Sequence, residues 1–433
     1  MRFPSPISDR SRGPASLRIA GRSLLEPNQI HMTTAPEFDP DRALRLSRRL
    51  AFPRAVGSPG ERLAARLVER ALARAGRPAV RERFPVGVEA RRYGSLLAVL
   101  GAAALVVVGL VMVMARIRPG LAPAPFLAAS WLVNAPWMVT RSLANRWRSR
   151  VWSENLVSWP IEHEEPAPSR VVLVAHYDSK SQRLPTGVRV AMVLSATSGG
   201  LALATMAAVE AIAPDLIGPS PMAAAGGMVL LALAALMVNA SGNRSPGALD
   251  NASGLAVLLE LARVLPPLGE EGVDVAFVAS GAEEVGLDGA RAFLQRHEWW
   301  LRERPSLLIN LDSVGAGDRV RLAGEASAVA MAERVADSIA VPTERFRILG
   351  AGMDHEPFAA AGLPALTLLG DVVGHSSAMH SSRDLPELVD REAMGRAGLL
   401  AIRLILAWAD RYRPVAEGAS IAESGGRSPG PSR

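Results

Sequence analysis

Two side chains that can serve a metal site follow an apolar run in the stretch "VVLVAHYDSK", residues 171–180. His176 ends the run, and Asp178 comes two residues later. On extended backbone, residues two apart point to the same face. Asp178 can therefore accept the second ring proton of His176 and fix the tautomer that binds a metal. The pattern predicts a metal ligand whose partners must come from elsewhere in the chain.

Three further apolar runs also end in oxygen or nitrogen ligands. These residues are Glu283 and Glu284 after "VDVAFVAS", Asp312 at the end of "SLLINLD", and His380 beyond "ALTLL". Each alone says little, because such a histidine is often structural and such an aspartate often caps a helix. Four strand ends that all carry metal-binding types indicate one shared site. The chain has no cysteine, so His, Asp and Glu must supply the ligands.

The stretch "GALDNASG", residues 247–254, contributes Asp250 just before an expected helix. This aspartate could simply cap that helix. A pair of metal ions about 3.5–4 Å apart instead needs one bridging carboxylate, and an aspartate in this place can offer both oxygens. The adjacent Glu283 and Glu284 project differently, so one can bind metal while the other acts as general base toward a water molecule.

Composition narrows the class of protein. The net charge of +6 comes from arginines interleaved with acidic residues, without aromatic partners, which argues against nucleic-acid binding. Four long apolar runs cover 96–115, 121–140, 190–209 and 221–240. The first has no charge and is about as long as a bilayer is thick, whereas prolines interrupt the second. The runs predict two membrane hairpins, each of which returns the chain to the side it left.

Between these runs, strand and helix patterns alternate. Strands are expected at 155–159, 171–175, 273–279, 307–311 and 365–369, and helices at 42–77 (with a break), 255–264, from 289 and 392–408. This rhythm predicts an α/β fold with helices on both faces of a sheet. In such folds ligands gather at the carboxyl ends of strands, where the acids and histidines lie.

Taken in order, several motifs resemble metallopeptidase family twenty-eight, the di-zinc aminopeptidases of the aminopeptidase S and aminopeptidase Y type. The matching pieces are "AHYDS", "GALDNASG", "GAEEVGLDGA", "INLDSVG", "DHEPFAAAGLPAL" and "HSSRDLPELVD". The resemblance implies a three-layer α/β/α zinc-exopeptidase fold with a central mixed sheet, two Zn²⁺ ions and peptide substrates. It implies that His176 and Asp312 hold one zinc, that Glu284 and His380 hold the other, and that Asp250 bridges them. It also implies that Glu283 is the general base and that Asp178 lies behind His176.

The hairpins are where the sequence departs from this family, because the second separates His176 from Asp250. We expect disordered ends at 1–39 and 414–433, hairpins at 94–141 and 188–241, and one peptidase domain assembled from 40–93, 142–187 and 242–413. The hairpins are expected to anchor the chain in a lipid bilayer without completing the metal site. The arginines next to the spans lie mostly on the catalytic side, which predicts a cytoplasmic catalytic domain.

Alternative functions remain open at this point. A carboxypeptidase or a single-zinc glutaminyl cyclase would share the fold, and a membrane transporter or scaffold could keep the domain for binding alone. The near absence of ionisable groups from the spans argues against transport. Among other residues, Asp384 is a candidate support or helix cap, and His375 competes with His380 as ligand. We expect Asp354 and His355 beside the site, and His163 and His297 at the surface.

Overall fold

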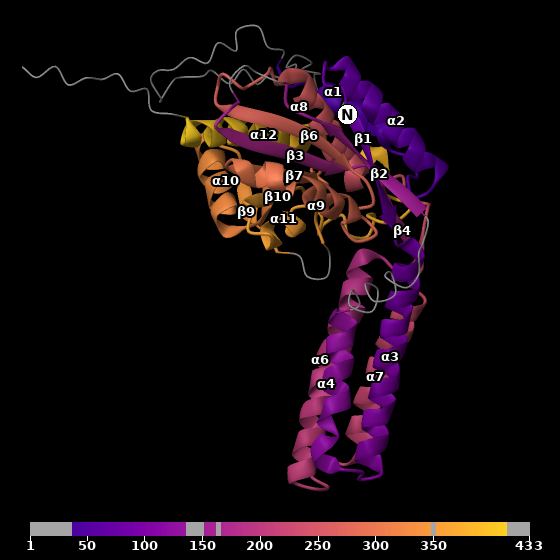
Figure 1. Ribbon diagram of the computed structural model, residues 1–433. Helices are drawn as coiled ribbons and strands as arrows, with labels where there is room; N and C mark the ends of the chain where they lie inside the picture. Colours follow the sequence, from indigo (N-terminus) through magenta and orange to yellow (C-terminus); the bar gives the residue numbers. More distant parts are fainter. Residues whose placement is uncertain (1–36, 136–150, 162–165, 348–351, 414–433) are drawn as a thin grey trace, which may run out of the picture. The chain divides into compact units, whose positions relative to one another are not determined.

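The central sheet has eight strands in the order β1-β2-β6-β3-β7-β10-β8-β9 (Figure 1). The computed structural model describes residues 37–135, 151–161, 166–347 and 352–413. The strands are β1 (Val80–Val86), β2 (Val151–Ser158), β3 (Ser169–His176), β6 (Val273–Ser280), β7 (Ser306–Asp312), β8 (Val320–Gly324), β9 (Thr343–Arg345) and β10 (Ala365–Leu369). Strands β6, β3, β7 and β10 run parallel, while β1, β2 and β8 pair antiparallel with neighbours, so the sheet is mixed.

Alternate residues of β3 enter two different cores. Val171 and Leu173 belong to the core beneath α1 (Pro40–Leu50), α2 (Pro59–Arg74), α8 (Gly254–Val264), α10 (Ala326–Ser338) and α12 (Arg391–Tyr412). Val172 and Val174 belong to the core beneath α9 (Asp288–Glu303) and α11 (Glu356–Ala360). A strand covered by helices on both faces is apolar throughout, which is why its sequence reads as a continuous run. The chain thus has the three-layer α/β/α fold expected from its sequence.

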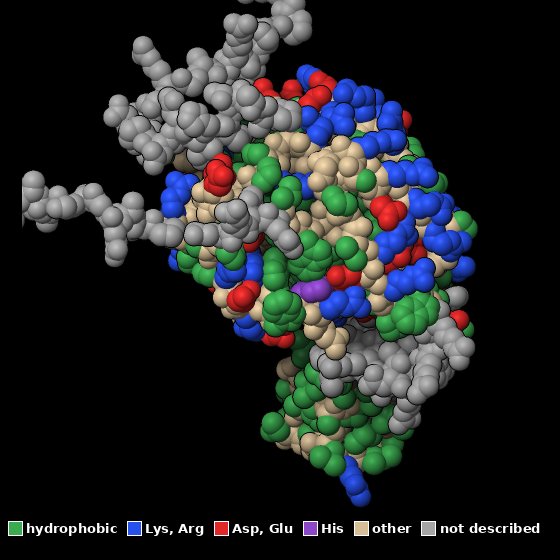
Figure 2. Space-filling model, turned by 45° about the horizontal axis from the view of Figure 1, so that its top comes forward, with side chains coloured by type: hydrophobic (Ala, Val, Ile, Leu, Met, Phe, Trp, Pro, Cys, Tyr) green, Lys and Arg blue, Asp and Glu red, His purple; other side chains and the backbone are tan. Residues whose placement is uncertain are grey.

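Four helices from the two insertions pack against one another: α3 (Val88–Met114), α4 (Pro123–Asn134), α6 (Thr186–Ile212) and α7 (Pro219–Met237). Their shared core includes Phe126, Leu203 and Met222. Much of the outer surface of these helices, in the lower part of Figure 2, is hydrophobic, in contrast to the charged surface above it. In the described residues, three helices are long and apolar enough to cross a membrane: 93–114, 186–212 and 219–237.

Within the second expected span, 121–140, the described residues form the 12-residue helix α4, which ends at Asn134, and residues 136–140 lie outside the described residues. The segments expected to be disordered, 1–39 and 414–433, also lie outside them, except for 37–39 before α1. The five strands and the helices that the sequence predicts outside the apolar runs are present. Strands β1, β8 and β9 were not foreseen, since each is short, contains charged residues and has no long apolar run.

Candidate metal centre

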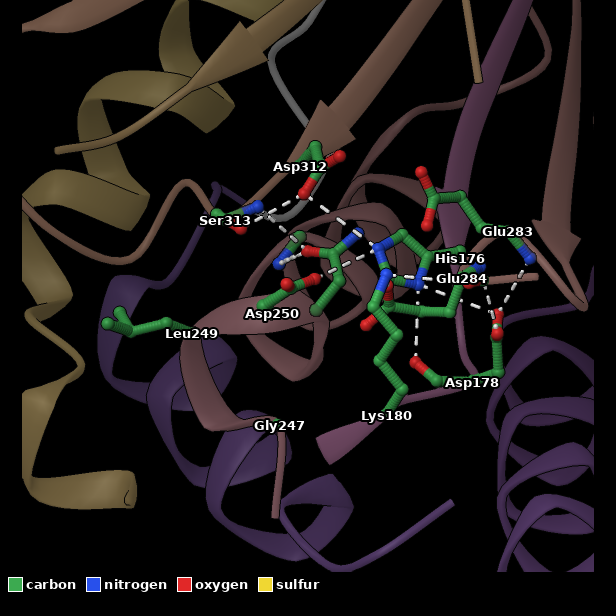
Figure 3. Close-up of polar contacts among 12 residues, drawn as sticks. His176, Asp178, Lys180, Gly247, Leu249, Asp250, Glu283, Glu284, Asp312 and Ser313 are labelled. Atoms are coloured by element: carbon green, nitrogen blue, oxygen red, sulfur yellow. Dashed lines mark hydrogen bonds and ion pairs between the residues drawn. The ribbon is translucent and has the colours of Figure 1, made fainter. Parts of the chain in front are cut away.

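Three neighbouring parallel strands carry four of the residues in question to one edge of the sheet. His176 is the last residue of β3, and Asp312 is the last residue of β7 beside it. Glu283 and Glu284 follow β6, which pairs with β3 on its other side. Because the carboxyl ends of parallel strands coincide, residues more than a hundred positions apart meet there (Figure 3).

Asp250 lies between two histidines. Its Oδ1 is 3.2 Å from Nε2 of His176, and its Oδ2 is 2.8 Å from Nε2 of His380. The two oxygens of one carboxylate therefore face two different imidazoles. This is the arrangement that a bridging ligand between two metal ions requires.

Each histidine has a second carboxylate nearby. Asp312 Oδ1 is 3.8 Å from His176 Nε2, and Glu284 Oε1 is 3.3 Å from His380 Nε2. The donor atoms of His176, Asp250 and Asp312 all lie within 4.8 Å of one another, and so do those of Asp250, Glu284 and His380. The chain therefore presents two adjoining triads, each with one nitrogen and two carboxylate oxygens, that share Asp250.

These donors fit zinc, which binds histidine nitrogen and carboxylate oxygen in catalytic sites with one position left open. His176 is 1% exposed and Asp250 is 6% exposed. Within the described structure, the buried Nε2 of His176 and Oε1 of Glu284 make no hydrogen bond of regular geometry, and the nearest polar atoms belong to the other members of their triads. Buried polar atoms are normally satisfied, so these two point to a ligand.

The electrostatics of the centre also favour a bound cation. Burial lowers the pKa of His380, but the negative charges of Glu284 and Asp250 outweigh burial and raise this pKa to about 9. Burial raises the pKa of Glu284, yet His380 and Lys180 bring it down to about 2. Several carboxylates crowded in a buried space need positive charge, which metal ions supply.

Asp178 lies beside His176 and also supports a neighbouring turn. Its Oδ1 is 3.6 Å from Nδ1 of His176, whereas the backbone oxygen of Asp178 is 3.2 Å from that nitrogen. Its carboxylate accepts hydrogen bonds from the backbone N–H groups of Glu283, at 3.1 Å, and Glu284, at 3.2 Å. The side chain thus supports the turn that carries both glutamates, while its backbone faces the imidazole.

The loop before Asp250 is held by contacts from distant segments. The carboxylate of Asp384 accepts the backbone N–H groups of Leu249, at 2.7 Å, and Asp250, at 3.3 Å. Asp384 therefore supports the loop, the first of the two roles considered for it. Gly247 has a φ of +59°, and a Cβ there would lie 2.5 Å from the backbone oxygen of Asp250, so the turn requires glycine. Buried Arg54, which the sequence reasoning missed, donates to the Gly247 oxygen at 3.0 Å.

Three more residues near the centre were also missed. Lys180 Nζ is 2.5 Å from Glu284 Oε2, the Gln182 amide is 2.7 Å from His380 Nδ1, and Thr186 Oγ1 is 3.3 Å from the same nitrogen. Asn239, within the second expected hairpin, donates to Gln182 at 3.2 Å. A residue of the expected hairpin thus reaches the surroundings of the site through Gln182, but it belongs to neither triad, and the expectation that the hairpins do not complete the metal site stays a prediction. In the sequence, the only indication that Lys180, Gln182 and Thr186 lie near the site was that they follow His176 closely.

The remaining candidates lie outside both triads. Asp354 is buried and accepts from Ser280 Oγ, and Nδ1 of His355 is 2.6 Å from Thr367 Oγ1. His375 contacts the backbone oxygen of Asp371 at 2.9 Å. His297 pairs with Glu82 at 2.8 Å, and its side chain is only 12% exposed, so it is less superficial than expected. His163 lies outside the described residues.

Solved structures with a similar fold include two aminopeptidases and a cyclase. The zinc aminopeptidase BSAP from Bacillus subtilis is 15% identical, with a TM-score of 0.50, covering 86% of this chain and 95% of that one. The aminopeptidase from Aneurinibacillus sp. strain AM-1 is 15% identical, with a TM-score of 0.49 and coverages of 87% and 97%. The glutaminyl cyclase from Fimbriiglobus ruber is 18% identical, with a TM-score of 0.49 and coverages of 86% and 96%. The likeness to BSAP shows the fold.

No curated protein matches the chain in sequence. The model of Peptidase family M28 matches residues 225–405. That range holds Asp250, Glu283, Glu284, Asp312 and His380. His176 and Asp178 precede it in the sequence and are separated from it by α6. Residues 225–405 of the chain are therefore similar to peptidase family M28.

Proposed function

We propose that the protein is a membrane-bound di-zinc exopeptidase and, more specifically, an aminopeptidase that removes N-terminal residues from peptides. The observation that carries the proposal is the position of Asp250, with one oxygen toward His176 and the other toward His380. Two complete triads share this carboxylate. A structural or scaffolding role alone would not require two sets of buried donors that converge in this way.

The proposal assigns His176 and Asp312 to one zinc, Glu284 and His380 to the other, and Asp250 to both. When bound, the zinc ions supply Lewis acidity, which polarises a carbonyl oxygen and makes water more acidic. Asp250 and the two histidines set the spacing of the pair. Asp384 and Gly247 hold the loop of Asp250 in place, so the bridging carboxylate keeps its orientation through the reaction.

Glu283 is the proposed general base. It belongs to neither triad, and its side chain lies beside the centre in Figure 3. Burial raises the pKa of Glu283 well above the usual range, which makes its carboxylate a better proton acceptor. In this role Glu283 takes a proton from the attacking water and then transfers it to the nitrogen of the leaving amine. The peptide bond is thereby cleaved without any net change in the charge of Glu283.

The preference for an aminopeptidase rests on likeness. The motifs resemble those of di-zinc aminopeptidases, residues 225–405 match a peptidase family, and the similar fold of BSAP belongs to a zinc aminopeptidase. A free α-amine at the substrate's end would be attracted by the carboxylates around the centre. The apolar surfaces of α3, α6 and α7 support membrane attachment as part of the proposal.

The test combines metal analysis with a substrate panel on the full chain, purified in detergent. We expect about two zinc ions per chain and hydrolysis of aminoacyl anilides that have a free amine. Matched substrates with an acetylated amine should resist hydrolysis. Cleavage of C-terminally free, N-blocked peptides would instead indicate a carboxypeptidase, and cyclisation of N-terminal glutamine would indicate a cyclase. Hydrolysis that Glu283→Gln leaves intact would contradict the role of Glu283 as general base.

A further inference from the structure

The segment that joins strand β3 to helix α6 contacts two of the metal-binding residues. We name residues 180–186 the lead-in segment. It contains the short strand β4 (Ser181–Gln182) and ends with the first residue of α6. Its Lys180 is paired with Glu284, and its Gln182 lies against His380, both through side chains. Glu284 and His380 are the two residues that the proposed function assigns to one zinc alone.

In both cases the contact is made away from the shared centre. Glu284 turns Oε1 toward His380, and Lys180 binds the opposite oxygen, Oε2, at 2.5 Å. His380 turns Nε2 toward Asp250, and the side-chain amide nitrogen of Gln182 lies 2.7 Å from the opposite nitrogen, Nδ1. A metal ion on Nε2 leaves the histidine proton on Nδ1, so the Gln182 amide supports the metal-binding tautomer when its oxygen faces the ring. A partner on the outer oxygen of a carboxylate fixes the orientation of that carboxylate.

The backbone of the lead-in segment reinforces this contact. The N–H of Gln182 donates to the backbone oxygen of His380 at 2.8 Å, so the two residues are joined through main chain as well as side chain. Thr186 Oγ1, on the first turn of α6, lies 3.3 Å from the same Nδ1. The first residue of a helix long and apolar enough to cross a membrane therefore touches a metal-binding side chain.

The far end of the same hairpin joins this network. Asn239, which follows α7, donates from Nδ2 to Gln182 Oε1 at 3.2 Å and accepts the N–H of Leu184 at 3.1 Å. Strand β4 also pairs with β5 (Ser241–Gly242), just beyond Asn239. Both ends of the hairpin thus converge on Gln182.

The other triad is held by the sheet instead. His176 and Asp312 are the terminal residues of β3 and β7. Nδ1 of His176 faces the backbone oxygen of Asp178, and Oδ1 of Asp312 accepts from Ser313 Oγ at 3.0 Å. These supports lie within or next to the sheet and involve no residue of the hairpin.

We propose that Lys180 and Gln182 are positioning residues for the metal position of Glu284 and His380, so that the ends of the second hairpin set the zinc affinity of that position. The inference rests on the proposed di-zinc function. It means that the insertion between His176 and Asp250 is part of the metal site and serves it selectively. Rearrangement of α6 against α7 would change the occupancy of one zinc position and leave the other filled.

The test is a zinc titration of the full chain in detergent against a competing chelator. Gln182→Ala should weaken one of two binding steps by about 10–100-fold, the usual effect of removing such a support. The weakened step should be the one that Glu284→Gln also weakens, and Asp312→Asn should weaken the other. Gln182→Glu should keep the affinity near that of the parent, because a carboxylate can accept from both His380 and Asn239.

Two further variants separate positioning from local folding. Ser181→Ala is the matched control: Ser181 is adjacent in β4, and its hydroxyl accepts the N–H of Arg244 at 3.1 Å rather than contacting a metal-binding residue. It should leave both steps unchanged. Asn239→Ala should weaken the same step as Gln182→Ala, by a smaller factor, because it acts through Gln182.

The outcomes distinguish this inference from the proposed function. A parent chain that binds fewer than two zinc ions contradicts the di-zinc proposal, whatever the variants do. If the parent binds two, equal weakening of both steps by Gln182→Ala, or no weakening of either, overturns the inference alone. Weakening by Ser181→Ala as large as that by Gln182→Ala would also overturn it, because the effect would then come from β4 as a whole.

Discussion

The carboxylate of Asp178 accepts the backbone N–H of Glu283 at 3.1 Å, and its other oxygen accepts the next N–H. A side chain two residues after His176, at the end of β3, therefore supports the proposed general base Glu283, which follows β6. The turn that it supports includes Ala282, whose φ is +55°. An alanine in the left-handed region is held there by its surroundings, and Asp178 is part of them.

Asp178→Ala should lower kcat for the preferred anilide by about 10²-fold. A shift of about 1 Å in the position of a catalytic group lowers the rate by about that factor. The circular dichroism spectrum should be retained. Asp318→Ala is the control, because the side chain of Asp318 is 82% exposed at the surface, and it should leave kcat unchanged. An unchanged kcat in Asp178→Ala would show that the turn keeps its position without this carboxylate.

The adjacent glutamates should respond differently to the same substitution. Glu283→Gln should retain zinc and lose hydrolysis by about 10²–10⁴-fold, as expected for a general base. Glu284→Gln should release zinc at lower chelator concentration, because Glu284 belongs to a donor triad and Glu283 does not. Zinc content and kcat measured together on both variants decide the matter. The reverse pattern would exchange the two roles.

Asp250→Asn should lower the occupancy of both zinc positions, because Asp250 is the one residue common to the two triads. The amide presents a single oxygen and no negative charge. Zinc content per chain is the measurement, with Asp312→Asn as the comparison, in which only one position should weaken. Equal zinc content in Asp250→Asn and the parent would contradict a bridging role.

The buried Glu61 should make the stability of the folded protein depend on pH. Its side chain accepts hydrogen bonds from Ser153 Oγ and the Gly57 N–H, both at 2.5 Å, and the residue is 3% exposed. Burial outweighs these bonds and raises the pKa of Glu61 from 4.5 to about 7. The folded state therefore binds more protons than the unfolded state between these values. Stability from this group is fully present below pH 4.5 and is lost as pH rises through 7, by about 3 kcal/mol in all.

Glu61→Gln, which stays neutral, should remove this dependence. The thermal midpoint of the variant should rise relative to the parent as pH increases from 4.5 to 8. Glu298→Gln is a matched control, because Glu298 is 48% exposed and its surface pair with Arg302 should contribute little. If the thermal midpoints of Glu61→Gln and the parent changed in parallel with pH, a group other than Glu61 would cause the pH dependence.

The orientation of the proposed membrane hairpins is also testable. The flanks on the catalytic side include Arg141, Arg146, Arg148, Arg150 and Arg244, whereas the hairpin tips have Arg116 and Arg118. In the structure Arg116 pairs with Asp215 of the other tip, which further reduces the positive charge there. Positive flanks stay cytoplasmic, so protease added outside intact cells should spare the catalytic domain until the cells are lysed. Cleavage before lysis would reverse the orientation.

Local patterns in the sequence were sufficient to predict the order and type of the main helices and strands. The run before His176 is apolar at every position because both faces of β3 are covered, and that property is visible in one stretch of sequence. The same holds for the candidate ligands, since zinc accepts few residue types and these stood at successive strand ends. The edge strand β9, with three residues and two of them charged, lacked any such local signal.

Only the tertiary structure decided which atoms face one another. The sequence allowed Asp178 to face His176, and the turn after β6 also brings two backbone N–H groups to its carboxylate. Likewise, Gln182 and His380 are separated by 198 positions, and their contact depends on how a hairpin and a distant loop are placed. Residue type and spacing are properties of a short segment, whereas a hydrogen bond depends on distances and angles set by the packing of whole elements.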